Sequence, residues 1–315
     1  MTTSAELKDL FEKQSSALRE SATDAPAARA ERIKRLISVV QKRADDICEA
    51  AAADYAGNRS RRNAIMFDVL GAIDPLQKAL ASFESWCAPV ECAPNEYFAA
   101  AGATLSLHYR PRGVVGILGT WNFPFFTVFS PLADALAAGN RVIVKPSELT
   151  PRCADLMAEI IAEACDSSEL ACVTGEADIS AAMCDLPFSR LIFTGSTQTG
   201  KKVMQAAAKN LTPVTLELGG KCPVLIGEGG VSPLHMDRLV FGKLMNSGQV
   251  CLAPDYLLAT EGDIEPVVTA IRQSATQMFP SGAGEDDYVG IVNDRHHARL
   301  SGLLEDAKAK GAEII

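Results

Sequence analysis

The stretch Gly113-Val114-Val115-Gly116-Ile117-Leu118 decides the fold, because it is a continuous apolar run that ends in a loop and precedes a helical pattern. Further short strands are expected at Arg141–Lys145, Ala171–Thr174, Leu191–Thr194 and Val214–Leu218, with helices at about Pro131–Ala138, 151–165 (N-cap Thr150) and Thr199–Lys209. Short apolar strands that alternate with helices indicate a parallel sheet covered on both faces. The sequence therefore predicts an α/β fold.

The segments before this sheet are expected to be helical and then to change character. Residues 25–56 place apolar side chains at spacings of three, four and seven, which indicates one amphipathic helix, and a second helix is expected at about 61–86. Within residues 90–110, Thr104–Tyr109 alternates apolar and polar side chains as a half-exposed strand does. We interpret residues 90–110 as a β-ribbon arm for oligomerisation.

The last third of the chain predicts a second α/β unit. Strands are expected at Val224–Ile226 and 255–260, and helices at 236–247, 264–278 and 293–310. A domain boundary is expected just after Gly219-Gly220, which divides the chain into domains 1–219 and 220–315. Glu313-Ile314-Ile315 resembles the opening of a strand that lacks its remaining half, so the second domain is expected to be incomplete.

Composition narrows the classes of partner and compartment. The 315 residues are 48% apolar, and a net charge of −9 argues against nucleic acid and anionic membranes as partners. The nine cysteines include no Cys-x-x-Cys pair and only four histidines occur, so neither a metal site nor a disulfide framework is predicted. The polar, charged N-terminus does not resemble a signal peptide, and glycines and prolines break the uncharged run 113–133. A cytoplasmic protein without a membrane span is expected.

A glycine-rich turn follows one of the expected strands and opens a helix. In Phe193–Lys201, Gly195 and Gly200 are spaced as Gly-x-x-x-x-Gly around Ser196, and backbone amides at a helix N-terminus suit a pyrophosphate. This spacing differs from the Gly-x-Gly-x-x-Gly fingerprint, and a plain turn before a helix remains the alternative.

Charged residues follow another strand of the sheet. Lys145 and Glu148, in Val144–Glu148, would lie at a carboxyl end of the sheet, where they could hold the two hydroxyls of an adenosine ribose. The alternative is a surface lysine beside a helix-capping Ser147 and Glu148.

The residues that could carry covalent chemistry lie in three separate loops. Cys251 lies between an expected helix and an expected strand, among small residues and amides, with Pro254 preventing a continuous helix. The side-chain amide of Asn122 must find a partner among apolar neighbours, and stabilising an oxyanion would be such a use. Glu217 lies between two leucines, which would raise its pKa toward that of a general base. The alternatives are a buried structural cysteine, a structurally bonded amide and an ion-paired glutamate.

Taken together and in order, these motifs resemble the aldehyde dehydrogenase superfamily. The segments that carry the resemblance are Thr120–Phe125, Lys145–Glu148, Phe193–Gly200, Leu216–Lys221 and Gly248–Cys251. Gln249–Tyr256 is similar to the class 3 branch, and Leu211–Lys221 with the Trp-Asn-Phe-Pro-Phe run resembles bacterial coniferyl aldehyde dehydrogenases. The resemblance spans essentially the whole chain and implies a Rossmann-like coenzyme domain, a catalytic domain and a homodimer.

The resemblance also implies a mechanism with named residues. Cys251 would attack the aldehyde, Asn122 and the Cys251 backbone N–H would hold the oxyanion, and Glu217 would activate the water that releases a carboxylate. The implied cofactor is NAD, since Glu148 would repel a 2′-phosphate, although NADP remains possible in this branch. The implied cofactor-binding residues are Thr120, Trp121, Lys145, Glu148, Gly195, Ser196, Gly200 and Leu218.

One departure from the family pattern concerns length. Family members are longer, and their Glu-x-Phe-Gly-Pro motif and C-terminal strand are absent from this sequence. A C-terminally truncated chain is therefore expected, one that folds poorly or is inactive by itself. The function expected for the family is oxidation of an aromatic aldehyde such as coniferyl aldehyde, or of a medium-chain aldehyde. The alternatives are an inactive fragment that only binds dinucleotide or joins a full-length partner, and a CoA-dependent enzyme, which Glu217 disfavours.

Overall fold

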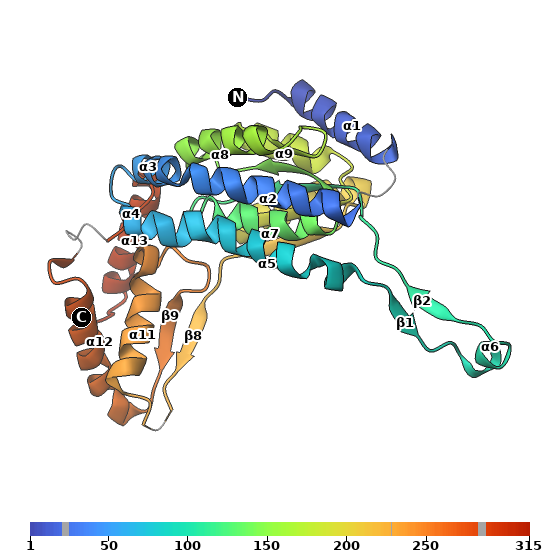
Figure 1. The fold of residues 1–315 in the computed structure, drawn as a ribbon. Coiled ribbons are helices and arrows are strands. Elements are labelled where there is room, and N and C mark those ends of the chain that lie inside the picture. Colours follow the sequence, from blue (N-terminus) through green and yellow to red (C-terminus); the bar gives the residue numbers. More distant parts are fainter. Residues whose placement is uncertain (21–24, 228, 283–287) are drawn as a thin grey trace.

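The principal sheet is parallel and five-stranded in a computed structural model that describes residues 1–20, 25–227, 229–282 and 288–315 (Figure 1). Its order is β5-β4-β3-β6-β7, and its strands are β3 (Val114–Leu118), β4 (Arg141–Lys145), β5 (Leu170–Cys172), β6 (Arg190–Gly195) and β7 (Val214–Leu218). From β3 the chain builds outward first through β4 and β5, then returns to the other side with β6. Ligands of open parallel sheets bind at such a reversal, beyond the carboxyl ends of the strands. The predicted parallel sheet is confirmed.

Helices cover both faces of this sheet. Alternate strand residues point to opposite sides and are apolar on both, so each face packs against helices. Val115 and Ile117 of β3 join one core with α2 (Pro26–Lys42), α3 (Ala44–Asp54), α5 (Leu70–Cys87), α7 (Phe126–Ala137) and α8 (Pro151–Ala164). Val114 and Leu118 join a second core with α1 (Ser4–Glu20), α9 (Ala177–Asp185) and α10 (Thr197–Ala207). The short helix η2 (Ala208–Asn210) follows α10.

Several helix boundaries differ from those expected. The single helix 25–56 breaks at Arg43, yet its apolar stripe stays buried on both sides of the break. The helix expected at 61–86 consists of α4 (Arg61–Ala64), the π-helical turn η1 (Ile65–Val69) and α5. Helix α7 begins at Phe126 and accommodates Pro131 in its interior, so the prediction that it starts at Pro131 was wrong.

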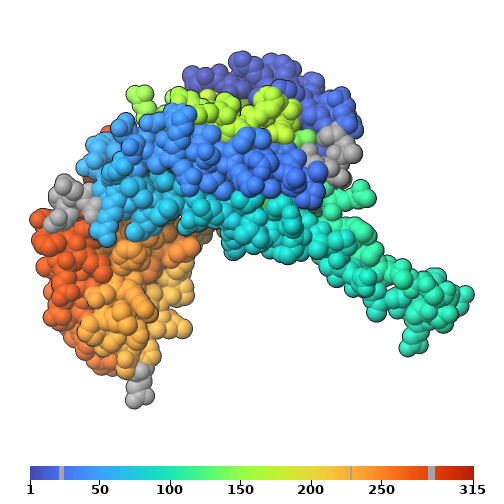
Figure 2. All heavy atoms as spheres, viewed as in Figure 1, coloured from blue at the N-terminus to red at the C-terminus, as the bar shows by residue number. Residues whose placement is uncertain are grey.

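The expected ribbon projects away from the rest of the chain (Figures 1 and 2). Strands β1 (Val90–Cys92) and β2 (Leu105–Leu107) pair antiparallel, and α6 (Glu96–Ala100) lies at the tip. Every residue of both strands is exposed. The prediction of a half-exposed strand was therefore wrong, because no described element packs against either face of the ribbon.

The chain changes sheets after Gly219-Gly220. Strands β8 (Cys222–Leu225) and β9 (Pro254–Leu258) form a separate two-stranded parallel sheet, and α11 (Pro233–Leu244) packs against β9 and α12 (Ile264–Met278). In the part of the chain that the structure describes, the remaining elements are η3 (Met245–Gly248), η4 (Glu261–Asp263) and α13 (Asp294–Ala309). The domain boundary at this point stays a prediction. Glu313–Ile315 is exposed and irregular, so the strand expected there does not form. Among the described residues, every helix is too short or too polar to cross a membrane.

Candidate active site

The loops singled out in the sequence meet at one edge of the parallel sheet. In register, Leu118 of β3 lies beside Lys145 of β4 and Phe193 of β6, and Gly195 lies beside Leu218 of β7. The Gly119 backbone N–H donates to the carbonyl oxygen of Lys145 at 2.9 Å, which joins the first two loops directly. The predicted cofactor-binding residues of β3, β4, β6 and β7 therefore lie along a common rim.

The turn after β6 opens helix α10 as expected. Ser196 is the N-cap, and its Oγ accepts the Thr199 backbone N–H at 3.2 Å. A Cβ added to Gly200 would lie 2.9 Å from Cδ2 of Leu218, and one added to Gly195 would lie 2.5 Å from the Phe193 ring. Both glycines are thus needed for close packing between α10, β6 and β7. Their role in binding a pyrophosphate stays a prediction.

The loop after β4 carries a buried lysine. The Lys145 side chain is only 2% exposed, so the alternative of a surface lysine was wrong. Its Nζ donates to Oε2 of Glu148 at 2.9 Å and to the carbonyl oxygen of Pro146 at 3.1 Å. Partial burial raises the pKa of Glu148, but the Lys145 hydrogen bond and charge outweigh that effect and the net pKa lies below its ordinary value.

Helix α8, which follows this loop, has an unexpected cap. Thr150 occupies the N-cap position as predicted, but its side chain makes no capping hydrogen bond. Instead, the Asp54 carboxylate of α3 accepts the backbone N–H groups of Arg152 at 3.0 Å and Cys153 at 2.8 Å. A carboxylate is favoured at a helix N-terminus over a neutral hydroxyl. Here the carboxylate belongs to α3, a helix that is distant in sequence.

The Glu148→Gln variant is expected to lose a small, pH-dependent part of the stability. Because the folded pKa of Glu148 is lowered, its contribution is present above the ordinary value of 4.5 and is lost as pH falls through the folded pKa. We expect a difference below about 1 kcal/mol, since the carboxylate remains partly exposed. Urea titrations at several pH values measure it, with the exposed Glu176→Gln as the control. A difference that stays constant from neutral pH into the acid range would contradict the assignment.

The loop that leads to Cys251 has an unusual backbone. The sequence predicts a helix to residue 247, but α11 ends at Leu244, and Asn246, Ser247 and Gly248 are all left-handed, with φ of 49°, 54° and 74°. The left-handed region costs about 1–2 kcal/mol for each non-glycine residue. Gln249 holds the turn, because its Nε2 donates to the carbonyl oxygens of Asn246 and Gly290, both at 3.0 Å.

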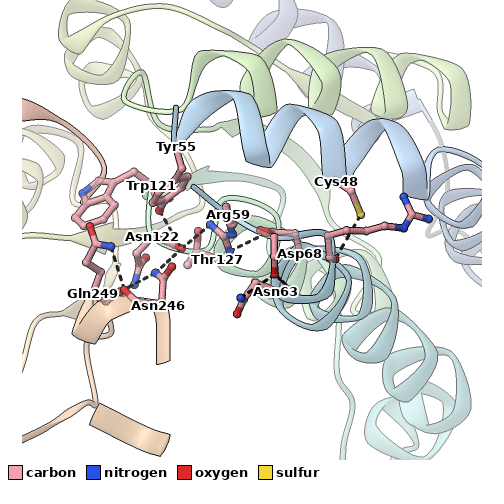
Figure 3. A network of polar contacts seen from close by, with 12 residues as sticks. Cys48, Tyr55, Arg59, Asn63, Asp68, Trp121, Asn122, Thr127, Asn246 and Gln249 are labelled. Atoms are coloured by element: carbon pink, nitrogen blue, oxygen red, sulfur yellow. Dashed lines mark hydrogen bonds and ion pairs between the residues drawn. The ribbon is translucent and has the colours of Figure 1, made fainter. Parts of the chain in front are cut away.

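Asn122 lies against this loop (Figure 3). Its Nδ2 donates to the backbone carbonyl oxygen of Gln249 at 3.0 Å. The backbone carbonyl oxygen of Asn122 accepts a hydrogen bond from Nδ2 of Asn246 at 3.1 Å. Its Oδ1 is buried without a hydrogen-bond partner. The structure therefore brings Asn122 beside the backbone two residues before Cys251, although the two residues are far apart in sequence. Its role at an oxyanion stays a prediction.

The residues next to Asn122 are fixed by other parts of the chain. Thr127 Oγ1 accepts the Thr120 backbone N–H at 3.3 Å, and the Trp121 ring lies 5.1 Å from the ring of His296 on α13. The loop after β3 is thus anchored at both Thr120 and Trp121 as well as at Asn122.

Cys251 is exposed, and its backbone faces the turn after β7. A Cβ added to Gly220 would lie 2.9 Å from the carbonyl oxygen of Cys251, which also accepts the Cys222 thiol at 3.8 Å. Glu217, three residues before Gly220, is exposed. The interpretation of Glu217 as a carboxyl group flanked by apolar groups was wrong, because Leu216 and Leu218 point to the opposite face of the strand and pack against the core.

The sequence-based list of site residues missed Tyr55, Arg59 and Asp68. Tyr55 Oη donates to the carbonyl oxygen of Trp121 at 3.1 Å, and Arg59 Nη1 donates to that of Asn122 at 3.2 Å (Figure 3). Both act on backbone atoms of a loop more than sixty positions away. No local sequence pattern signals such a contact.

The chain is similar to known proteins over its whole length. The aldehyde dehydrogenase family profile matches residues 1–315. A probable coniferyl aldehyde dehydrogenase of Caulobacter vibrioides is 37% identical over 99% of this chain, and the coniferyl aldehyde dehydrogenase of Pseudomonas sp. (strain HR199) is 40% identical over 91% of it. The chain spans 64% and 59% of these two relatives, respectively.

Solved structures give the same result for the fold. The substrate-bound Staphylococcus aureus AldH superposes with a TM-score of 0.90 at 31% identity, covering 98% of this chain and 66% of that one. A Mycobacterium tuberculosis aldehyde dehydrogenase complexed with NAD⁺ has a TM-score of 0.87 at 23% identity, over 100% of this chain and 65% of that one, which supports the fold alone. The order of the motifs, the parallel sheet and these similarities lead to one conclusion: the chain belongs to the aldehyde dehydrogenase family.

Proposed function

We propose that this chain carries the nucleophile and the coenzyme-binding part of an NAD(P)-dependent oxidation of an aldehyde to a carboxylic acid. The observation that supports it most is the contact between the Asn122 amide and the loop of Cys251, beside the carboxyl edge of the parallel sheet. An amide donor at this position can face the oxygen of a carbonyl group whose carbon the Cys251 sulfur attacks.

The residues then have the following roles. The Cys251 thiolate adds to the aldehyde carbon, and the carbonyl electron pair moves to the oxygen, which the Asn122 amide and the Cys251 backbone N–H stabilise. An oxidised nicotinamide, when bound, supplies the hydride acceptor that converts this adduct to a thioester. Glu217 removes a proton from water, the water oxygen adds to the thioester carbon, and the carbon–sulfur bond breaks to release the carboxylate and the Cys251 thiolate.

The residues at the rim fit a dinucleotide. Lys145 is buried with its ammonium group at the sheet edge, and the partly exposed Glu148 carboxylate is held beside it. The N-terminus of α10 offers a positive dipole end for phosphate. Glu148 would repel a 2′-phosphate, so we propose NAD as the preferred cofactor and NADP as the second choice. The names of the Caulobacter and Pseudomonas relatives favour an aromatic aldehyde such as coniferyl aldehyde.

The Glu217→Gln variant tests this function. We expect a burst of about one NADH per active chain, because thiohemiacetal formation and oxidation do not need the carboxylate. The steady rate should then fall by about 10²–10⁴-fold, as is typical for the loss of a general base. Rapid mixing of the enzyme with NAD and coniferyl aldehyde, followed at the NADH absorbance, measures both phases.

The exposed carboxylate Glu176 provides the control for this experiment. Glu176→Gln should turn over like the unmodified chain. Unchanged steady turnover in Glu217→Gln would remove Glu217 from the mechanism. Loss of the burst as well as the steady rate would assign Glu217 an earlier step.

A second candidate function is supported by the apolar side chains around the two-stranded sheet. Leu225, Leu252 and Leu258 are 74%, 67% and 54% exposed, and the chain spans about two thirds of its relatives. These exposed apolar side chains support a function in which the chain binds dinucleotide, or joins a full-length partner, but does not turn over substrate by itself. Titration of NAD with and without an aldehyde separates the two: binding without NADH formation supports the second candidate.

The β-ribbon and the thiols support two further expectations. The exposed apolar side chains Val90, Leu105 and Leu107 lie on one face of the β1–β2 ribbon, which is consistent with a homodimer in which that face of the arm contacts the second subunit. All nine cysteines carry free thiols, which is consistent with a reducing compartment such as the cytoplasm.

A further inference from the structure

A fully buried ion pair lies behind the loop that carries Asn122. Arg59 lies between α3 and α4, and Asp68 lies in the π-helical turn η1. Their Nη2 and Oδ2 atoms are 2.7 Å apart, and both side chains are 0% exposed. The guanidinium group lies 4.9 Å from the centre of the Tyr55 ring and 5.7 Å from that of Phe123. Aromatic rings therefore pack around the charge and keep it from water.

The guanidinium group connects two elements at once. While Nη2 faces Asp68, Nη1 donates to the Asn122 carbonyl oxygen at 3.2 Å (Figure 3). Tyr55 Oη lies 3.4 Å from the same carbonyl oxygen. Nδ2 of Asn246 donates to it from the other side at 3.1 Å. A continuous set of contacts thus runs from the π-helical turn through Arg59 and Asn122 to the turn that precedes Cys251.

Stability alone is a weak reason for such a pair. Removing two charges from water is costly, and apolar side chains of similar volume often serve a buried position equally well. The planar guanidinium group, however, offers several donors in a fixed geometry, which a single ammonium group cannot reproduce. In addition, π-helical turns occur frequently at functional sites. Asp68 lies in η1, and Arg59 contacts both Asp68 and Asn122. These two facts indicate that the pair serves to hold the Asn122 loop in a fixed position.

We propose that the Arg59–Asp68 pair is a positioning device, which fixes the backbone of Asn122 and thereby aims its side-chain amide at the oxygen of a carbonyl group bound to Cys251. This inference rests on the proposed function. Neither member of the pair touches the reacting atoms. Loss of the pair should therefore weaken stabilisation of the oxyanion while leaving the thiol and the nucleotide rim intact.

The test uses formation of the covalent adduct without nucleotide. The Cys251 sulfur adds reversibly to the carbonyl carbon of coniferyl aldehyde, the carbonyl electron pair moves to oxygen, and a proton from solvent completes a hemithioacetal. This step needs no oxidant. The adduct protects Cys251 from alkylation by iodoacetamide, which peptide mass spectrometry detects site by site.

The main variant replaces both charges, Arg59→Met with Asp68→Leu, so that no buried charge is left unpaired. We expect the aldehyde concentration that halves alkylation to rise about 10-fold or more, because a preorganised donor loses its aim. The rate of Cys251 alkylation without aldehyde and the NAD dissociation constant should each stay within about twofold of the values for the unmodified chain. The variant leaves Cys251 and Lys145 in place. A purely structural role would instead alter all three measurements together.

Two further variants keep the test decisive. Lys42→Met with Glu163→Leu removes an exposed ion pair between α2 and α8, and should leave protection unchanged. Arg59→Lys retains the charge but cannot contact Asp68 and Asn122 together, so it should show the same loss of protection if the double variant does not fold. If whichever of these two Arg59 variants folds still protects Cys251 from alkylation as the unmodified chain does, the positioning role is overturned. Absence of protection in the unmodified chain overturns the proposed function itself.

Discussion

Replacement of Cys251 by serine is expected to abolish aldehyde-dependent formation of NADH, with a loss on the order of 10⁴-fold or more. The thiolate is the nucleophile of the proposed route, and a neutral hydroxyl in the same exposed position is a far weaker one. The variant should still fold, because the Cys251 side chain lies outside the core and its backbone contacts with Gly220 and Cys222 remain. The measurement is the initial rate of NADH absorbance at saturating NAD and aldehyde.

Two other cysteines serve as controls for this substitution. Cys92 is exposed in the ribbon, and Cys222 donates its thiol to the Cys251 carbonyl oxygen. Cys92→Ser and Cys222→Ser should each retain turnover. If Cys251→Ser kept a rate comparable to these controls, the covalent route would be wrong.

The Asn122→Ala variant is expected to lower kcat by about 10²–10³-fold. Alanine has no side-chain amide to donate to the oxyanion. The substitution also removes the hydrogen bond that the Asn122 amide donates to the Gln249 carbonyl oxygen. The second loss should lower the free energy of unfolding by about 1–3 kcal/mol. Steady-state kinetics and urea unfolding measure the two effects separately. The alkylation rate of Cys251 without aldehyde should change little, because the thiol itself is untouched.

Asn140 provides a matched control for Asn122. It is a buried asparagine, whereas Asn122 is half-buried, and it lies at the opposite end of the sheet, where its Oδ1 accepts the backbone N–H groups of Arg112 at 2.7 Å and Gly113 at 3.1 Å. Asn140→Ala should lower stability without lowering kcat for each folded chain. Equal losses of kcat in Asn122→Ala and Asn140→Ala would identify the Asn122 effect as one of folding alone.

The sheet could be predicted because its signal is local. A strand buried on both faces, such as β3, must be apolar throughout, and the loops that follow β3, β4 and β6 then meet at one edge by necessity. The proximity of Asn122 to the loop of Cys251 was less accessible to sequence reasoning. It depends on how the loop after β3 docks against a turn far away in the chain.

Contacts between elements account for what the sequence did not predict. Asp54 accepts the backbone N–H groups at the start of α8 to which the Thr150 side chain does not bond, and Asp68 pairs with Arg59; both contacts involve side chains that come together only in the folded chain. Glu217 was misjudged for a different reason. Its neighbours in sequence lie on the opposite face of β7, so apolar flanks say little about the surroundings of a strand residue.

The left-handed turn at Asn246–Gly248 limits how the loop before Cys251 can evolve or be redesigned. Glycine, asparagine and aspartate tolerate this backbone region, whereas β-branched side chains do not. Libraries intended to broaden the range of accepted aldehydes should therefore leave these three codons nearly constant. Diversity is better directed to exposed sites such as Leu252, where the backbone places no comparable restriction on the side chain.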